Sequence, residues 1–192
     1  YQCCRYSLQG LQWIQLKEWR TANGPVERPP LGTPIYAAID FSKSFDLTSL
    51  AYGFWLEGKF HVNWHHWAIK DPHIEGVKRH YQRFVDNWDR YENVTICNHQ
   101  VQYDAVKEKL EELKTWGNLK RVGYDALGGM KTSVQTWGDI DENYNPDTDL
   151  PMWSMPQTIM VMGPSTYLAE SFLRHRNLVI SPDPVVEYAL AN

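Results

Sequence analysis

The segment "IYAAIDFSKSFDLTSLAYGFW", from Ile35 to Trp55, combines two apolar runs with two acidic residues. A run of small and apolar residues, Ile35–Ile39, leads to one acid, Asp40, and a polar turn with a second acid, Asp46, follows it. Another apolar run then begins. Short apolar runs bounded by turn residues are typical of strands. The pattern therefore predicts a strand that delivers a carboxylate to a turn, and a second strand directly after that turn.

Composition sets broad limits on the protein class. The chain has 192 residues, of which 43% are hydrophobic and 22% charged, and this is ordinary for a single globular domain. Its net charge of -4 gives no global argument for nucleic-acid binding, so such binding would need a local basic patch. The three cysteines have no metal-ligand spacing and are expected to be reduced intracellular thiols. We expect neither a membrane span nor a signal peptide.

Patterns along the chain predict a connector at residues 1–33 and one α/β domain at residues 34–192. "LEGK", Leu56–Lys59, reads as a tight turn between two antiparallel strands. The acidic stretch Asp139–Trp153 is expected to be a loop. The predicted strands are Ile35–Ile39, Leu47–Leu56, Lys59–Trp67, Val94–Cys97, Arg121–Tyr124 and Asn177–Ser181. The predicted helices are His73–Asp89, Asp104–Leu113, Met130–Trp137, Pro164–His175 and Pro184–Ala191.

Three antiparallel strands followed by helix–strand alternation form the order of a ribonuclease H-like mixed sheet flanked by helices. In that layout the strand that ends at Asp40 lies beside a later parallel strand, here the one that ends at Asp125. Two carboxylates on rigid neighbouring strands suit a hard divalent cation, Mg²⁺ or Mn²⁺. An aspartate at a strand end is more often a turn or cap residue, so the spacing alone leaves that alternative open.

Several segments resemble the nuclease domain of tailed-phage terminase large subunits. The stretch "QWIQLKEWRTANGPVERPPLGTPIYAAIDFSKSFDLTSLA", residues 12–51, resembles the start of that domain: Asp40-Phe41-Ser42 matches an Asp-Leu-Ser-like triplet and Asp46-Leu47-Thr48 matches Asp-Leu-Thr. "VTICNHQVQYDAVKEKLEEL" and "RVGYDALGG" resemble the strand, turn and helix before the second acid and the strand that carries it. "DPVVEYALAN", residues 183–192, resembles the closing Asn-Pro-Val-Leu-x-Trp-x-x-x-Asn motif.

The resemblance implies a metal-dependent endonuclease that cuts concatemeric double-stranded DNA during genome packaging. Asp40 and Asp125 would be the catalytic metal ligands, with Asp46 as an outer ligand and two metal ions in the complete site. The implied partners are DNA, an ATPase motor domain, a small terminase subunit and a portal. The implied location is the host cytoplasm during phage assembly, outside the mature virion. No phosphate-binding loop of the ATPase type occurs in the sequence, so we expect an isolated C-terminal nuclease domain.

The end of the chain departs from the family pattern. The family has a third catalytic aspartate after the closing motif, and the sequence stops at Asn192, so we expect that ligand to be absent and the activity to be impaired. Asp183 stands where the family usually has Asn. It is either a substitute metal ligand or a loop residue, and we favour the loop residue.

Other polar residues are weaker candidates. The basic clusters Lys78-Arg79 with Arg83, and Arg174 with Arg176, could contact DNA phosphates, although a solvated helix face is the commoner explanation. His61 and His65 could form a metal pair, but a half-buried strand face is favoured. Two other functions stay open: a resolvase-type or integrase-type ribonuclease H-like enzyme, and a non-catalytic docking module in a packaging motor.

Overall fold

The chain folds around one mixed β-sheet. The computed structural model describes residues 14–42, 47–70, 85, 87–125 and 134–191. The strands are β1 (Pro34–Asp40), β2 (Thr48–Leu56), β3 (Lys59–Ile69), β4 (Val94–Cys97), β5 (Asn118–Tyr124), β6 (Met152–Ser154) and β7 (Leu178–Ile180). The helices are α1 (Leu16–Arg20), α3 (Tyr103–Trp116), α5 (Ile159–Arg174) and α6 (Pro184–Ala191).

The strand order is β4-β3-β2-β1-β5-β6, and β7 pairs with the first part of β3 on the edge that β4 shares. The first three strands are antiparallel neighbours, whereas β5 pairs in parallel with both β1 and β6. Glu57 and Gly58 make the two-residue turn between β2 and β3, with φ of 50° and 77°. Positive φ at both positions matches the twist of the paired strands.

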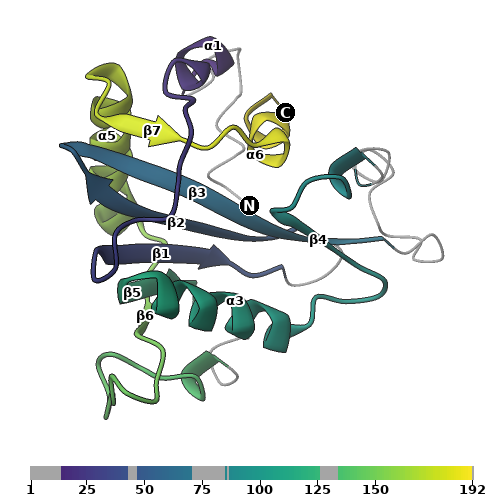
Figure 1. The fold of residues 1–192 in the computed structure, drawn as a ribbon, viewed down its shortest axis with the longest axis vertical. Coiled ribbons are helices and arrows are strands. Elements are labelled where there is room, and N and C mark those ends of the chain that lie inside the picture. Colours follow the sequence, from purple (N-terminus) through teal and green to yellow (C-terminus); the bar gives the residue numbers. More distant parts are fainter. Residues whose placement is uncertain (1–13, 43–46, 71–84, 86, 126–133, 192) are drawn as a thin grey trace.

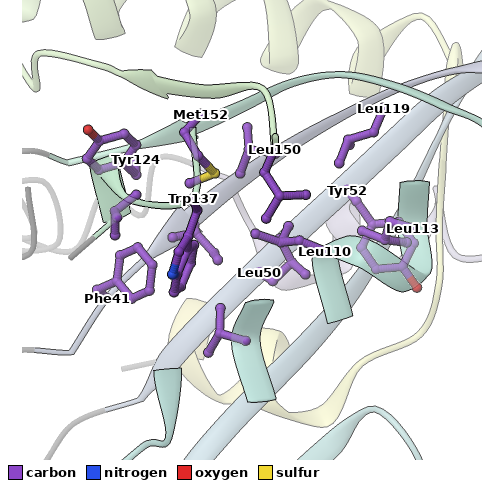
Figure 2. Packing of buried hydrophobic residues seen from close by; sticks show 14 of the residues in the cluster. Phe41, Leu50, Tyr52, Leu110, Leu113, Leu119, Tyr124, Trp137, Leu150 and Met152 are labelled. Carbon is purple, nitrogen blue, oxygen red and sulfur yellow. The ribbon is translucent and has the colours of Figure 1, made fainter. Parts of the chain in front are cut away.

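One face of the sheet packs against α3 and forms the main core. Apolar side chains recur on α3 at positions 106, 110 and 113, all fully buried, as a helix period of 3.6 requires. They meet alternate residues of β1 and β2, among them Ile39 and Leu50. Figure 2 shows this packing, with Phe41, Trp137 and Tyr124 extending the core toward the ends of β1 and β5.

The opposite face of the sheet is divided into a covered half and an exposed half. Over β3, two smaller apolar clusters join α1, α5, α6 and β7 to the sheet, and Figure 1 shows α1, β7 and α6 gathered on that side. Over β1, by contrast, Tyr36 is 47% exposed, and Ala38 and Asp40 are also exposed. The side chains of β1 that point away from α3 therefore face solvent.

The structure confirms the predicted mixed sheet with three antiparallel strands, but several elements differ from the predictions. Helix α1, Leu16–Arg20, lies in the segment expected to be an irregular connector, and β5 begins at Asn118 rather than at Arg121. The segment expected to be a loop, Asp139–Trp153, runs into β6, a three-residue strand that pairs with β5. Helix α5 begins at Ile159, so Pro164, expected to start the helix, lies inside it as the sixth residue. Most of the predicted helices at His73–Asp89 and Met130–Trp137 lies outside the described residues.

The packing of α3 on the sheet predicts a stability cost. Leu110→Ala should lower the free energy of unfolding by about 3 kcal/mol, because Leu110 is 0% exposed and its loss leaves a cavity. Leu31→Ala, at a position that is 84% exposed, is the matched control and should change it by less than about 0.5 kcal/mol. Urea denaturation measures both. Equal effects at the two positions would contradict this assignment of the core.

Candidate metal centre

Asp40 and Asp125 lie at the ends of two adjacent parallel strands. The register between β1 and β5 pairs Ile39 with Tyr124, so continuing it by one residue sets Asp40 opposite Asp125. Ile39 and Tyr124 both point into the core beneath α3, and alternation therefore turns the next residue of each strand to the other face. Adjacent strands are about 4.8 Å apart, a spacing that allows one cation to contact both carboxylates.

The turn after Asp40 is fixed by packing and by hydrogen bonds. Phe41 is buried against Tyr103 and Trp137, with ring centroids 5.8 and 6.2 Å apart, respectively. The Ser42 amide donates to Thr48 Oγ1 at 3.0 Å, and the two hydroxyls are also 3.0 Å apart. The small and polar residues of this turn thus tie the end of β1 to the start of β2, which limits the freedom of the backbone that carries Asp40.

The backbone that carries Asp125 is held from the other side by β6. The carbonyl of Tyr124 accepts a hydrogen bond from the Met155 amide at 2.8 Å, and the Val122 amide donates to the Pro151 carbonyl at 2.8 Å. Tyr124 itself is almost fully buried. The short strand missed by the sequence analysis is therefore one of the supports of the second acid.

The donor set fits a hard divalent cation in a solvent-accessible site. Asp40 is exposed and Asp125 is half-buried, so both carboxylates are reachable from water. No group of three or more His, Cys, Asp or Glu side chains able to hold a metal occurs among the described residues. Mg²⁺ keeps several of its waters and is often bound through one or two carboxylates, so the pair is compatible with it. Asp46 lies outside the described residues.

A line of polar side chains continues from Asp40 across the sheet. Ser49 is the register partner of Asp40 on β2, and His66 is the partner of Ser49 on β3. Ser49 Oγ lies 2.9 Å from His66 Nδ1, and His66 Nε2 lies 3.2 Å from Asp183 Oδ2. His66 and Asp183 are 2% and 3% exposed, so this polar line leads from the candidate centre into the protein interior.

Asp183 serves as the N-terminal cap of α6. Its Oδ1 accepts the backbone amides of Val185 and Val186, each at 2.8 Å, and its Oδ2 accepts from His66 and from the Asn93 amide. Four donors thus occupy the two oxygens. The structure does not bring Asp183 to Asp40 and Asp125. Its role as a helix cap explains its position without a metal, and this agrees with the favoured alternative, a loop residue.

Hydrogen bonding determines the charge of Asp183. Burial raises the pKa of this carboxyl, but the hydrogen bond and charge of His66, the Val186 amide and the Asn93 side chain together outweigh burial and hold the pKa below its ordinary value. An ionised Asp183 only accepts, so His66 Nε2 carries the proton that lies between them. In the neutral ring, Nδ1 then accepts from the Ser49 hydroxyl.

The other candidate residues lie away from the acid pair. Arg174 pairs with Glu170 at 2.6 Å near the end of α5, and Arg176 follows the helix. The carbonyl of the next residue, Asn177, accepts a hydrogen bond from the Phe60 amide. Phe60 lies beside the β2–β3 turn, whereas His66 lies toward the other end of β3. DNA contact by Arg174 and Arg176 therefore stays a prediction separate from this centre. Lys78, Arg79 and Arg83 lie outside the described residues.

The histidine pair is structural in this fold. His61 stacks on Phe54 with ring centroids 5.5 Å apart, and His65 Nε2 lies 2.9 Å from Thr95 Oγ1. Positions four apart on a strand are about 13 Å apart, which is too far for one ion to bridge. Burial, with the nearby charges of Lys109 and His66, lowers the pKa of His65 to about 4. His61 and His65 therefore lie on a half-buried strand face, the alternative that was favoured over a metal pair.

Comparison with solved structures identifies the fold. The chain is similar to the crystal structure of the HK97 bacteriophage large terminase, with a TM-score of 0.73 and 19% sequence identity. The similarity covers 92% of this chain and 35% of that protein, so the chain spans about a third of the length of that terminase. This chain has a terminase-like fold. No family model and no curated protein matches its sequence.

The polar line through Ser49, His66 and Asn93 in this terminase-like fold was not predicted from the sequence. The residues come from three separate strand regions, and only the register of the sheet brings them together. One signal was present: His66 is a polar residue in the apolar end of β3, and a buried polar group needs a partner.

None of the described helices is long and apolar enough to cross a membrane.

The cap at Asp183 predicts a pH-dependent stability. Asp183→Ala should lower the free energy of unfolding by about 2–3 kcal/mol at pH 7, since it removes a helix cap and leaves His66 and Asn93 without their acceptor. Because the native pKa is depressed, the contribution of this carboxylate is complete above its ordinary pKa of 3.8 and is lost as the pH falls through the lower native value.

Urea denaturation of both proteins at pH 7 and at several acidic pH values measures this difference. The gap in unfolding free energy between the native protein and Asp183→Ala should shrink toward low pH. Asp183→Ser retains a capping hydroxyl and should recover part of the loss. A gap that is independent of pH would show that the charge of Asp183 does not contribute.

Proposed function

We propose that this chain is a metal-dependent endonuclease domain that cuts double-stranded DNA during phage genome packaging. The observation that carries the proposal is the register of β1 and β5, which sets Asp40 opposite Asp125 on the exposed half of the sheet. Ligand sites of open α/β sheets commonly lie at the carboxyl ends of their parallel strands. The similarity to a phage large terminase gives the packaging context.

The roles of the two carboxylates follow from their positions. Asp40 and Asp125 would hold Mg²⁺ or Mn²⁺, which supplies charge stabilisation and an activated water for phosphodiester hydrolysis. The buried Phe41 and Tyr124 keep the two acids in place through their own backbone. In this proposal Asp46 is an outer ligand or orienting group, and the complete site contains two ions.

A serine nucleophile is a weaker alternative, although Ser49, His66 and Asp183 form a hydrogen-bonded series. Ser49 lies within β2, which is paired on both sides by β1 and β3, so the ladders occupy the strand's backbone amides. Acyl transfer needs free donors aimed at an oxyanion, and β2 cannot supply them from its own backbone. The hydrogen bonds that join Ser49, His66 and Asp183 are better explained as structural: they hold in place the strand residue that pairs with Asp40.

The partners proposed with this function are duplex DNA, an ATPase motor, a small terminase subunit and a portal, in the cytoplasm of an infected host. A resolvase-type enzyme would prefer branched DNA to linear duplex, and a docking module would bind motor components without cutting. Product analysis on linear and four-way junction DNA separates the first alternative. Absence of both metal binding and cleavage under any divalent cation favours the second, in which the acids serve the structure.

Metal binding by the acid pair is the direct test. Calorimetric titration should show that the chain binds one Mn²⁺ weakly, and that Asp40→Asn and Asp125→Asn each lower the affinity by at least about tenfold, because each removes one of two carboxylate ligands. Asp147→Asn, at an exposed loop acid, is the control and should bind as the native chain does. Native-like binding by the first two variants would contradict the assignment.

Cleavage of plasmid and linear duplex extends the test to chemistry. The 192-residue chain should cut slowly in Mn²⁺ and stop when a chelator is added. Asp40→Asn should remove the activity, whereas Asp46→Asn should only weaken it, since an outer group acts through a ligand. Cleavage that persists in excess chelator would refute a metal mechanism.

A further inference from the structure

A β-bulge in β5 places two consecutive cations on the exposed half of the sheet. Ile35 pairs with Leu119, but the next residue of β1, Tyr36, pairs with Arg121, so Lys120 is an extra residue in β5. Leu119 and Val122 are buried in the core on either side of the bulge, while Lys120 and Arg121 are both exposed. A regular strand would have turned one of the two toward the core.

Aromatic side chains flank these cations. The Arg121 guanidinium lies over the Trp153 ring, 4.9 Å from its centroid, and this contact limits the freedom of the side chain. Tyr36, the register partner of Arg121, is 47% exposed. Within the described parts of the chain, neither Lys120 nor Arg121 forms a salt bridge.

The bulge lies at a defined distance from the acid pair. Asp40 lies four positions after Tyr36, and Asp125 lies four positions after Arg121, which is about 13 Å along each strand. Successive phosphates of a DNA strand rise about 3.4 Å along the helix axis and also turn around it, so this distance corresponds to phosphates about two nucleotides apart on one strand. A DNA backbone that follows β1 and β5, with one phosphate at the acids, would therefore bring a nearby phosphate of the same strand to the bulge.

We propose that Lys120 and Arg121, supported by Trp153, bind the backbone phosphates of duplex DNA beside the candidate metal centre. The proposal rests on the proposed nuclease function and adds to it the surface that holds the substrate. An acid pair by itself repels DNA, and the chain is acidic overall, with a net charge of -4. Local cations on the same exposed face offset that repulsion where the substrate must lie.

DNA binding in a chelator separates this surface from catalysis. Fluorescence anisotropy with a labelled 30-base-pair duplex, across a salt series, compares the native chain with the double variant Lys120→Gln, Arg121→Gln. The variant should bind at least about fivefold more weakly at low salt, and the slope of log affinity against log salt should fall by about two, one for each lost phosphate contact. Exchanging the cations, as Lys120→Arg with Arg121→Lys, should restore the slope.

The matched control is Lys17→Gln with Lys59→Gln, which removes two exposed cations on α1 and at the β2–β3 turn and should leave the slope unchanged. Unchanged thermal unfolding of the Lys120 and Arg121 variant excludes a folding defect as the cause. A native slope in that variant overturns the inference and leaves the nuclease proposal intact. Absence of duplex binding by the native chain overturns both, and loss confined to single-stranded DNA overturns the assignment to duplex.

Discussion

The parallel ladder between β1 and β5 positions the candidate site and the core beneath it. It joins two segments that are distant in sequence, and its register sets Asp40 opposite Asp125. The same ladder contains the bulge that turns Lys120 and Arg121 to one face. Core packing on the α3 side fixes this register, since a slip of one residue would move Ile39 and the buried residues of β5 to solvent. The positions of the acids are thus a consequence of how the core is packed.

The row of residues that starts at Asp40 connects the candidate centre to the far edge of the sheet. Ser49 and His66 continue the row, and His66 meets Asp183, the cap of α6. Every hydrogen bond in this series has a buried or half-buried partner, where an unpaired polar group is costly. The series therefore links the orientation of α6 to the strand beside Asp40. It gives a physical reason for a polar residue, His66, in the apolar end of β3.

Much of this arrangement could be predicted from the sequence, and what could not has identifiable causes. Alternating apolar residues and the Glu57-Gly58 turn specify β1 to β3 locally, and the apolar spacing of α3 specifies its buried face. Strand β6 has three residues in an acidic, proline-containing stretch, too short to show a period, and it forms because β5 offers an unpaired edge. The bulge at Lys120 and the contact between Ser49 and His66 depend on register, which a single sequence does not encode in any local pattern.

Asp40 and Asp125 are proposed to share a divalent cation. The most direct measurement is anomalous scattering from crystals of the 192-residue chain soaked in Mn²⁺, with Asp40→Asn crystals as the reference. A shared cation should give an anomalous peak within about 2–2.5 Å of an oxygen of each carboxylate, and the peak should be lost in the variant. A strong peak at any other group of side chains, with none between Asp40 and Asp125, would contradict it.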